Sequence, residues 1–375
     1  MGEQGKRRIR LGMVGGGQGA FIGYVHRIAA RLDGEYELVA GALSSHSDVA
    51  KASAKLVGIA PERSYGDFAE MARVEAKRED GIEAVAIVTP NNMHFAPAKA
   101  FLEAGIHVIC DKPLTSTLED ALSLAEIKAK NNAKFLLTHN YTGYPLIRQG
   151  RAMIADGRLG NIRIVQVEYP QDWLTEQVSN KQADWRTDPE QSGAGGCIGD
   201  IGTHAYNLLR FVTGLETNSI SADLSSFVSG RMLDDNVHIM LRFKGGARGM
   251  LWASQVAPGN ENGLMLRVYG DKGGLKWRQD NPNQMHFTPF GEPEQLLSRG
   301  GAGFGGAGVM ARIPAGHPEG YLEAFATLYA EFAAVIRGES QGDLLPGLDD
   351  GLEGMKFIVA AVRSSNNDGI WTRLD

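Results

Sequence analysis

The chain has 375 residues, more than one compact core usually holds and enough for two domains. Hydrophobic residues make up 43% and charged residues 22%, which argues against disorder as the main state. The net charge of −6 argues against nucleic acid as a partner, since phosphate binding favours a basic face. The two cysteines, Cys110 and Cys197, form no Cys-x-x-Cys or Cys/His cluster, so we expect reduced thiols and no zinc site.

The start of the chain is short and polar, and the apolar run at 9–14 is too short to span a membrane. No hydrophobic segment typical of a secretory signal is recognised there. We therefore expect a cytoplasmic protein without a membrane segment.

The first part of the chain alternates apolar runs with amphipathic segments. Strands are predicted at 9–14, 36–42, 84–88, 106–110 and 135–138, with a further short strand considered at 64–65. Helices are predicted at 21–32, 49–57, 67–77, 95–104 and 118–131. This order predicts right-handed βαβ units and a doubly wound parallel sheet, a Rossmann domain of dinucleotide-binding type at 1–140.

The second part has a different pattern. Alternating strands are predicted at 162–169, 219–227, 237–243, 249–255 and 264–269, and helices at 199–212, 319–337 and 351–364. We expect an α+β domain at 141–375 with a large, mostly antiparallel open sheet, helices on one face, and roles in substrate binding and oligomerisation. The Gly/Ala-rich stretch at 300–316 is interpreted as a loop that is flexible without a ligand.

A glycine loop directly follows the first predicted strand and opens the first helix. Gly15-Gly-Gly17-Gln-Gly-Ala20 matches G-x-G-x-x-A, in which Gly15 makes a tight turn and Gly17 lets the backbone approach a pyrophosphate. Ala20 would let the helix pack close to the sheet, and the helix N-terminus would bind phosphate. The alternative is a tight turn serving another ligand. Cofactor contacts are predicted at Gly15, Gly17, Gln18, Gly19, Ala20 and Phe21.

The end of the second predicted strand bears on the choice between NAD and NADP. An acidic residue is expected there to hold the ribose of NAD, but the chain has Leu43-Ser44-Ser45-His46. It offers no carboxylate to repel a 2′-phosphate and no arginine to attract one. Ser44 and Ser45 are candidate ribose contacts, and these residues alone leave NAD and NADP open.

Four segments, in this order, resemble the Gfo/Idh/MocA family, the glucose–fructose oxidoreductase and inositol dehydrogenase group. They are the glycine loop, Thr89-Pro-Asn-Asn-Met-His94, Asp111-Lys112-Pro113 and Gly199-Asp200-Ile-Gly-Thr-His204. The match looks closest to the scyllo-inositol and L-glucose dehydrogenase branch. The resemblance implies NAD, with NADP as the alternative, a sugar or cyclitol substrate, and a dimer or tetramer. It implies further cofactor contacts at Thr89, Asn91, His94, Asp111, Lys112, Asn140, Trp185 and Arg186.

Lys112 follows a predicted strand at the end where ligands bind in parallel sheets, and we expect it where the two domains meet. Its ammonium can polarise a substrate oxygen and stabilise growing negative charge, whereas position alone allows an ordinary surface lysine. The family usually has Glu-Lys-Pro, so Asp111 shortens this carboxylate and keeps its charge. Cys110 ends the strand before it.

Asp200 and His204 are spaced i, i+4 and would share one face of a helix. The resemblance implies that His204 is the base that removes a hydroxyl proton, with Asp200 binding or orienting beside it. The alternatives are a capping aspartate with a structural histidine, or a metal site, for which no third ligand is found.

Four more residues are expected on the substrate side. Arg186 follows Trp185, and the alternative is a core indole with a surface arginine. Tyr141 and Asp172 each follow a predicted strand, and His317 ends the glycine-rich loop, from this subunit or a neighbouring one. Substrate contacts are thus predicted at Lys112, Tyr141, Asp172, Arg186, Asp200, His204 and His317.

Together these features predict an NAD(P)-dependent dehydrogenase. It would transfer hydride reversibly from a secondary alcohol of a cyclitol or pyranose, giving a ketone or lactone. Two other functions stay open on the same fold: a glycosidase that oxidises its substrate transiently with bound NAD, and a non-catalytic sensor of sugar or dinucleotide. The first would release no net NADH, and the second would bind without turnover.

Overall fold

The computed structural model describes residues 6–305 and 310–374. The polar start at 1–5 and residues 306–309 of the glycine-rich loop, both considered above, lie outside the described residues. The chain forms two compact units: the first unit contains residues up to 140 together with 322–352, and the second contains 141–321 together with 353 onward. No helix within the described ranges combines the length and apolarity that a bilayer crossing requires.

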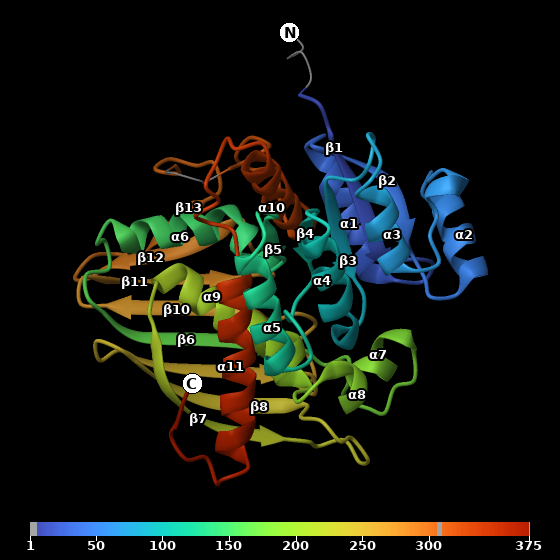
Figure 1. Ribbon diagram of the computed structural model, residues 1–375. Helices are drawn as coiled ribbons and strands as arrows, with labels where there is room; N and C mark the ends of the chain where they lie inside the picture. The colour runs from blue at the N-terminus through green and yellow to red at the C-terminus, as the bar shows by residue number, and fades with distance from the viewer. Residues whose placement is uncertain (1–5, 306–309, 375) are drawn as a thin grey trace. The chain divides into compact units, whose positions relative to one another are not determined.

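The first unit is built on a parallel sheet, whose five described strands run in the order β2-β1-β3-β4-β5 (Figure 1). Every residue of β3 is buried, as expected where helices cover both faces. Ser64, where the short strand was considered, lies outside the named strands and adds one parallel bridge to Gly41 of β2. The strand order reverses beside β1, which is where open parallel sheets bind ligands. The strands are β1 (Ile9–Gly15), β2 (Tyr36–Ala42), β3 (Ala84–Val88), β4 (His107–Cys110) and β5 (Phe135–Leu137).

Two helices of the first unit begin at capping side chains that the sequence supplies. Asp67 accepts from the backbone N–H of Glu70 at 3.0 Å, and Thr117 accepts from that of Asp120 at 3.2 Å. The helical elements are α1 (Phe21–Leu32), α2 (Ser47–Leu56), η1 (Pro61–Arg63), α3 (Phe68–Glu75), η2 (Asn91–Met93), α4 (Phe95–Glu103), α5 (Leu118–Ala129) and α10 (Tyr321–Ile336).

Helix α10 comes from far along the chain, and the sequence analysis placed it in the second domain. In the structure, residues 322–352 cluster with the first unit. The reason is apolar burial: the hydroxyl of Tyr36 donates to the backbone oxygen of Tyr329 at 3.0 Å, and both rings are buried. The Leu137 N–H also donates to the Pro346 oxygen at 2.9 Å, at the edge of the sheet.

The second unit is built on one large sheet, in which nine strands of the described ranges run in the order β13-β12-β11-β10-β6-β9-β8-β7-β14. The β6–β9 pair is parallel, and the other pairs are antiparallel. This confirms the predicted fold class. The strands are β6 (Ile162–Pro170), β7 (Thr217–Ser225), β8 (Asn236–Phe243), β9 (Arg248–Ser254), β10 (Met265–Gly270), β11 (Gly273–Arg278), β12 (Gln284–Pro289), β13 (Gln295–Ser298) and β14 (Thr372–Arg373).

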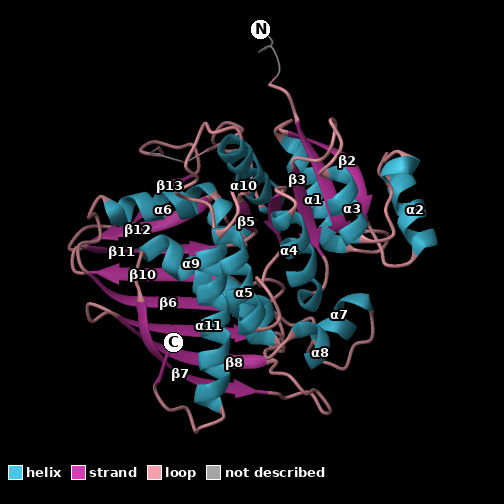
Figure 2. Cartoon of the chain, viewed as in Figure 1, coloured by secondary structure: helices cyan, strands magenta, loops and turns pink. Residues whose placement is uncertain are grey.

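Helices of the second unit pack on one face of this sheet (Figure 2). Helix α9 packs on β6, β9 and β10, and α6 packs on β11. Strands alternate accordingly: Val165 and Leu251 are buried against the helices, whereas Ile164 and Met250 on the other face are exposed. The helical elements are η3 (Asn140–Gly143), α6 (Pro145–Ala155), α7 (Lys181–Arg186), α8 (Pro189–Ser192), η4 (Ile198–Gly202), α9 (Thr203–Thr213) and α11 (Leu348–Ser365).

The helix predicted at 199–212 is two elements. Residues Ile198–Gly202 form a π-helical turn, and the α-helix α9 starts at Thr203. Asp200 therefore lies in the wider turn and His204 at the start of α9, rather than one α-helical turn apart. Such π-turns cost regular hydrogen bonding and are frequent at functional sites.

Candidate functional site

The glycine loop lies at the carboxyl end of β1 with the backbone that the motif predicts. Gly15 has φ +78°, and a Cβ there would lie 2.9 Å from the Val88 oxygen. Gly17 donates its N–H to the Leu43 oxygen at 3.2 Å, and a Cβ would lie 2.6 Å from that oxygen. The Gln18 N–H donates to the Ser53 hydroxyl at 3.1 Å. The loop is therefore fixed by contacts that exclude side chains.

The closest approach of α1 to this loop is at Gly23, which the sequence analysis did not single out. A Cβ at Gly23 would lie 2.4 Å from the Gly16 Cα, so the helix contacts the loop backbone itself. Ala20, by contrast, is half-buried and donates its N–H to the Gly17 oxygen. Helix α1 has no side-chain cap, which leaves its first N–H groups for an anion.

The segment after β2 has the polar character noted in the sequence. Ser44 is half-buried and its hydroxyl accepts from the His46 N–H at 3.1 Å, whereas Ser45 is exposed. Both hydroxyls follow β2 directly, which places them near the carboxyl edge of the sheet.

The loop after β3 and the turn at Lys112 are joined by His94. This ring is 1% exposed, and its Nδ1 lies 2.7 Å from the Pro113 oxygen and its Nε2 3.0 Å from the Thr89 oxygen. Burial lowers the pKa of His94. Asn91 is also buried, in η2. Two predicted cofactor residues, Thr89 and His94, thus hold the turn that carries Lys112.

Asp111 is directed into the first unit. Its Oδ1 accepts from the Thr138 hydroxyl at 2.8 Å and lies 3.9 Å from Nε2 of the buried His26. Burial alone would raise the pKa of Asp111, but His26, Lys112 and His94 lower it below its ordinary value. The carboxylate therefore stays ionised beside Lys112, and Lys112 itself is half-buried at the end of β4.

In the second unit, Asp200 is held by two donors. Its Oδ2 accepts from Arg186 Nε at 3.2 Å and from Gln255 Nε2 at 2.9 Å. Arg186 also stacks on Trp185, with the guanidinium 4.2 Å from the ring centroid. Gln255 is 3% exposed and directly follows β9. Sequence reasoning missed Gln255, because no motif marks a glutamine that acts on a residue in another element.

His204 lies in an aromatic setting within the second unit. Its ring centroid is 5.0 Å from that of Tyr141, nearly edge-on, and 6.4 Å from that of Tyr169. The two tyrosine hydroxyls contact each other, and burial raises the pKa of both. His204 is 9% exposed. The two tyrosines therefore fix the plane of the imidazole ring.

Two further residues, predicted to contact the cofactor or the substrate, form hydrogen bonds within the protein. Asn140, at the end of the first unit, is 1% exposed, and its N–H donates to the Thr138 oxygen at 2.9 Å. Asp172 follows β6, and its Oδ2 accepts from the Gly259 N–H at 3.1 Å. Asp172 thereby fixes a loop between β9 and β10.

His317 is exposed, but its backbone is anchored. Arg299, which is 2% exposed, donates to the carbonyl oxygens of Ile313 at 2.7 Å and Pro314 at 3.1 Å, and also to that of His317. Glu319 pairs with Arg299 at 3.2 Å. The end of the loop predicted to be flexible is therefore held in place in the structure, because a buried ion pair binds its carbonyl groups.

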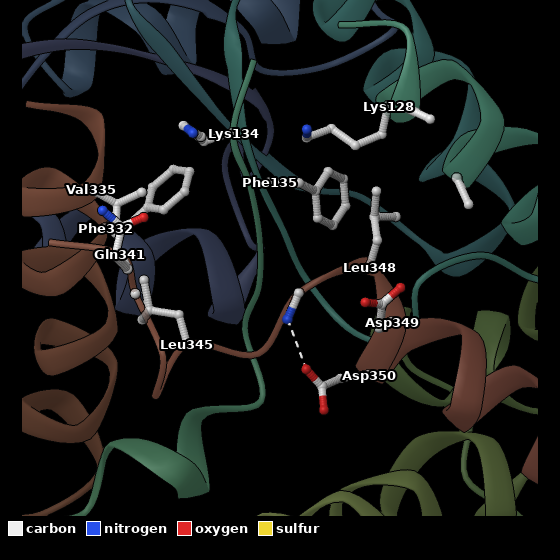
Figure 3. Close-up of a pocket in the computed structure, with 14 residues that line it drawn as sticks. Lys128, Lys134, Phe135, Phe332, Val335, Gln341, Leu345, Leu348, Asp349 and Asp350 are labelled. Atoms are coloured by element: carbon white, nitrogen blue, oxygen red, sulfur yellow. Dashed lines mark hydrogen bonds between the residues drawn. The ribbon is translucent and has the colours of Figure 1, made fainter. Parts of the chain in front are cut away.

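A separate cavity of about 480 Å³ lies within the first unit, and none of the predicted site residues lines it. Figure 3 shows Lys128 and Lys134 on one side of Phe135, with Asp349 and Asp350 toward the other. Both aspartates belong to the first turn of α11, where acidic residues stabilise a helix. The Asp350 carboxylate accepts from the Gly347 N–H at 2.9 Å.

Two family models match the chain. Residues 9–139 match an oxidoreductase family with an NAD-binding Rossmann fold, and residues 147–276 match the GFO/IDH/MocA C-terminal domain. The two matches together span more than half of the chain, and they contain the predicted site residues except Asn140, Tyr141 and His317.

Individual proteins are similar over nearly the whole length. The uncharacterized oxidoreductase YfiI of Bacillus subtilis (strain 168) is 35% identical, over 97% of this chain and 96% of its own. An oxidoreductase structure from Sinorhizobium meliloti is 57% identical with a TM-score of 0.91, covering 98% and 100%. An inositol dehydrogenase homolog from Azotobacter vinelandii, solved with NADH and myo-inositol, is 38% identical with a TM-score of 0.91, covering 98% of each chain.

Proposed function

Because this chain belongs to the GFO/IDH/MocA oxidoreductase family, we propose that it oxidises a secondary hydroxyl of a cyclitol or pyranose to the ketone or lactone. Its N-terminal domain is the family's NAD-binding Rossmann fold, and NAD is the cofactor. The homolog from Azotobacter vinelandii that binds NADH and myo-inositol supports the cyclitol class. The reaction removes a hydride and a proton from one CH–OH group.

The glycine loop fits the pyrophosphate of NAD. A Cβ at Gly15 or Gly17 would contact backbone oxygen, so the loop stays bare, and Gly19 has open space around it. The uncapped N–H groups at the start of α1 offer the phosphates hydrogen bonds and a partial positive charge. When bound, NAD⁺ supplies the acceptor for the hydride of the carbinol carbon.

The observation that carries the proposal is the setting of His204 and Asp200. His204 has its ring plane set by Tyr141 and Tyr169, and it accepts the hydroxyl proton as general base. Asp200 is fixed through Oδ2 by Arg186 and Gln255, and it accepts a hydrogen bond from a substrate hydroxyl. A polyol supplies the several hydroxyl donors that such acceptors require.

Lys112 has the complementary role. Its ammonium donates to the reacting oxygen and stabilises the negative charge that grows as the proton leaves. The Asp111 carboxylate and the His94 ring hold the ends of its turn. Further substrate contacts are proposed at Tyr141, Asp172, Arg186 and His317.

The decisive experiment follows reduced cofactor by its absorbance. NAD and NADP are each supplied with inositols, their ketones, and D- and L-pyranoses. We expect turnover with NAD and a cyclitol or pyranose, reversed by the matching ketone. Cleavage of a glycoside without net NADH would instead favour the glycosidase, and cofactor binding without any turnover would favour a sensor.

We further propose that the chain assembles as a dimer or tetramer through the outer face of the large sheet. Ile164, Met240, Met250 and Tyr269 are large, apolar and exposed on adjacent strands of that face. Light scattering should report a dimer or tetramer mass, and Met240→Glu should shift it toward the monomer. A monomeric wild-type chain would contradict the proposed assembly.

A further inference from the structure

The segment that carries Asp200 begins in a clamp formed by one residue, Asp234. Its carboxylate accepts from the Gly196 N–H at 2.7 Å through Oδ1 and from the Ile198 N–H at 2.8 Å through Oδ2. Its backbone oxygen accepts from the Cys197 N–H at 2.8 Å. Three successive N–H groups at the start of a helical segment, which have no partner inside the helix, are thus bound together.

The clamp leaves little room for movement. A Cβ at Gly196 would lie 2.3 Å from the Asp234 backbone oxygen and 2.9 Å from the Leu233 Cβ. The two backbone segments are therefore in direct contact, and a charged acceptor joins them. Charge-assisted hydrogen bonds of this kind are about twice as strong as neutral ones.

A second route connects the same region to Asp200. The oxygen of Asp235 accepts from the Gln255 N–H at 2.8 Å, and the Gln255 side chain donates to Asp200 at 2.9 Å. Asp235 is fully buried and pairs with Arg231 at 3.1 Å. These hydrogen bonds close a loop of contacts. Asp234 holds the π-helical turn that carries Asp200, Asp200 is bonded to Gln255, and Gln255 is bonded to Asp235, the neighbour of Asp234 in the chain.

We propose that Asp234 is a positioning residue for Asp200, because its carboxylate fixes the π-helical turn and thereby the direction of the Asp200 side chain. The inference rests on the proposed function, in which Asp200 binds a substrate hydroxyl. A misplacement of about 1 Å at such a contact costs on the order of 100-fold in rate.

The clamp also responds to pH. Burial raises the pKa of Asp234 to about 6, and the neighbouring Asp235 adds to this rise, whereas the Ile198 and Gly196 N–H groups oppose it. The Cys197 thiol beside the clamp has Asp234, Asp200 and Asp235 as charged neighbours, and burial raises its pKa well above its ordinary value. Above pH 6 the carboxylate accepts both N–H groups, and below it the added proton weakens one of the two bonds.

The test is Asp234→Asn, which keeps the volume but presents an amide N–H to one of the backbone N–H groups. We expect kcat at pH 8 to fall by roughly 10- to 100-fold. NADH affinity should change much less than kcat, because the glycine loop belongs to the other unit. The ratio of wild-type to variant kcat should shrink as pH falls through about 6, because protonation gives the wild type the same defect.

Asp271→Asn is the matched control, because Asp271 also accepts a backbone N–H, that of Asn161 at 2.9 Å, in a hairpin of the same unit. It should keep wild-type kcat at every pH. If Asp234→Asn does not fold, Asp234→Ser, which retains one acceptor, replaces it. The inference is overturned if the variant has wild-type kcat at pH 8, or if the ratio of wild-type to variant kcat is the same at every pH.

Failure of the proposed function is distinguishable from failure of the clamp. If the wild type oxidises no cyclitol or pyranose, the proposed function fails, and amide hydrogen exchange then decides the clamp without any turnover. Faster exchange of the Gly196–Ile198 amides in Asp234→Asn supports it, and unchanged exchange overturns it.

Discussion

At the scale of single residues, Lys112 illustrates how much of a reactive side chain depends on its neighbours. The lysine lies two residues after the strand β4, and its turn is held by the His94 ring through the Pro113 oxygen at 2.7 Å. The Asp111 carboxylate beside it stays ionised, because His26, Lys112 and His94 lower its pKa. His94 and Asp111, which were predicted as cofactor contacts, thus hold the backbone that carries the Lys112 ammonium.

Replacing Lys112 by Met removes that charge and keeps an apolar stem of similar length. We expect kcat to fall by roughly 100- to 1000-fold, as for loss of one donor to a developing oxyanion. NADH affinity should change little, which fluorescence titration of NADH can verify. Lys134→Met, on an exposed lysine of the same unit, is the control. Near-wild-type turnover in Lys112→Met would remove Lys112 from the mechanism.

At the scale of elements, the contact between α1 and the glycine loop sets the direction in which the first N–H groups of α1 point toward a bound phosphate. The backbones approach so closely at Gly23 and Gly16 that a methyl group cannot fit between them. Because the N–H groups of α1 would bind the pyrophosphate, any tilt of the helix changes their direction. The motif glycines thus depend on one further glycine inside the helix.

Gly23→Ala should therefore weaken NADH binding by about tenfold or more, equivalent to about 1.4 kcal/mol. Isothermal titration with NADH measures this directly. Gly354→Ala is the matched control, since Gly354 lies within α11 and has no atom within 4 Å of its Cβ position. The control should retain affinity and gain about 0.5–1 kcal/mol of unfolding free energy. Equal affinities in both variants would contradict the role of Gly23.

At the scale of the whole molecule, the first unit is completed by a segment from the far end of the chain. The buried rings of Phe325 and Tyr329 pack on His26, at centroid distances of 5.0 and 5.8 Å. The hydroxyl of Tyr329 lies 2.8 Å from the His26 Nδ1. Without α10 these apolar surfaces would face water.

A chain of residues 1–140 alone should consequently fail to fold cooperatively, whereas the same residues joined to 322–352 by a flexible linker should fold and bind NADH. Circular dichroism during heating and NADH fluorescence measure the two properties. The linked chain should melt in one transition. A 1–140 chain that melts cooperatively and binds NADH as tightly as the full protein would show that α10 is dispensable.

The fold of the first unit could be predicted almost strand by strand, because its signals are local. A buried parallel strand is a short apolar run, and the glycine motif occupies six adjacent positions, Gly15 to Ala20. The sequence analysis did not predict the later strands β11, β12 and β13. Gly273, Gly274 and the polar residues of these strands weaken the alternation of apolar and polar residues that marks a strand. They become strands by pairing with β10 and with one another.

The sequence by itself determined the family pattern, the cofactor loop and the identity of Lys112, Asp200 and His204 as candidates. Only the tertiary structure decided what holds them. Gln255 reaches Asp200 across 55 residues, Asp234 reaches Gly196 across 38, and Tyr36 reaches Tyr329 across 293. Hydrogen bonds and ring contacts depend on distances in space, and such distances between remote residues arise only when the sheets and helices pack.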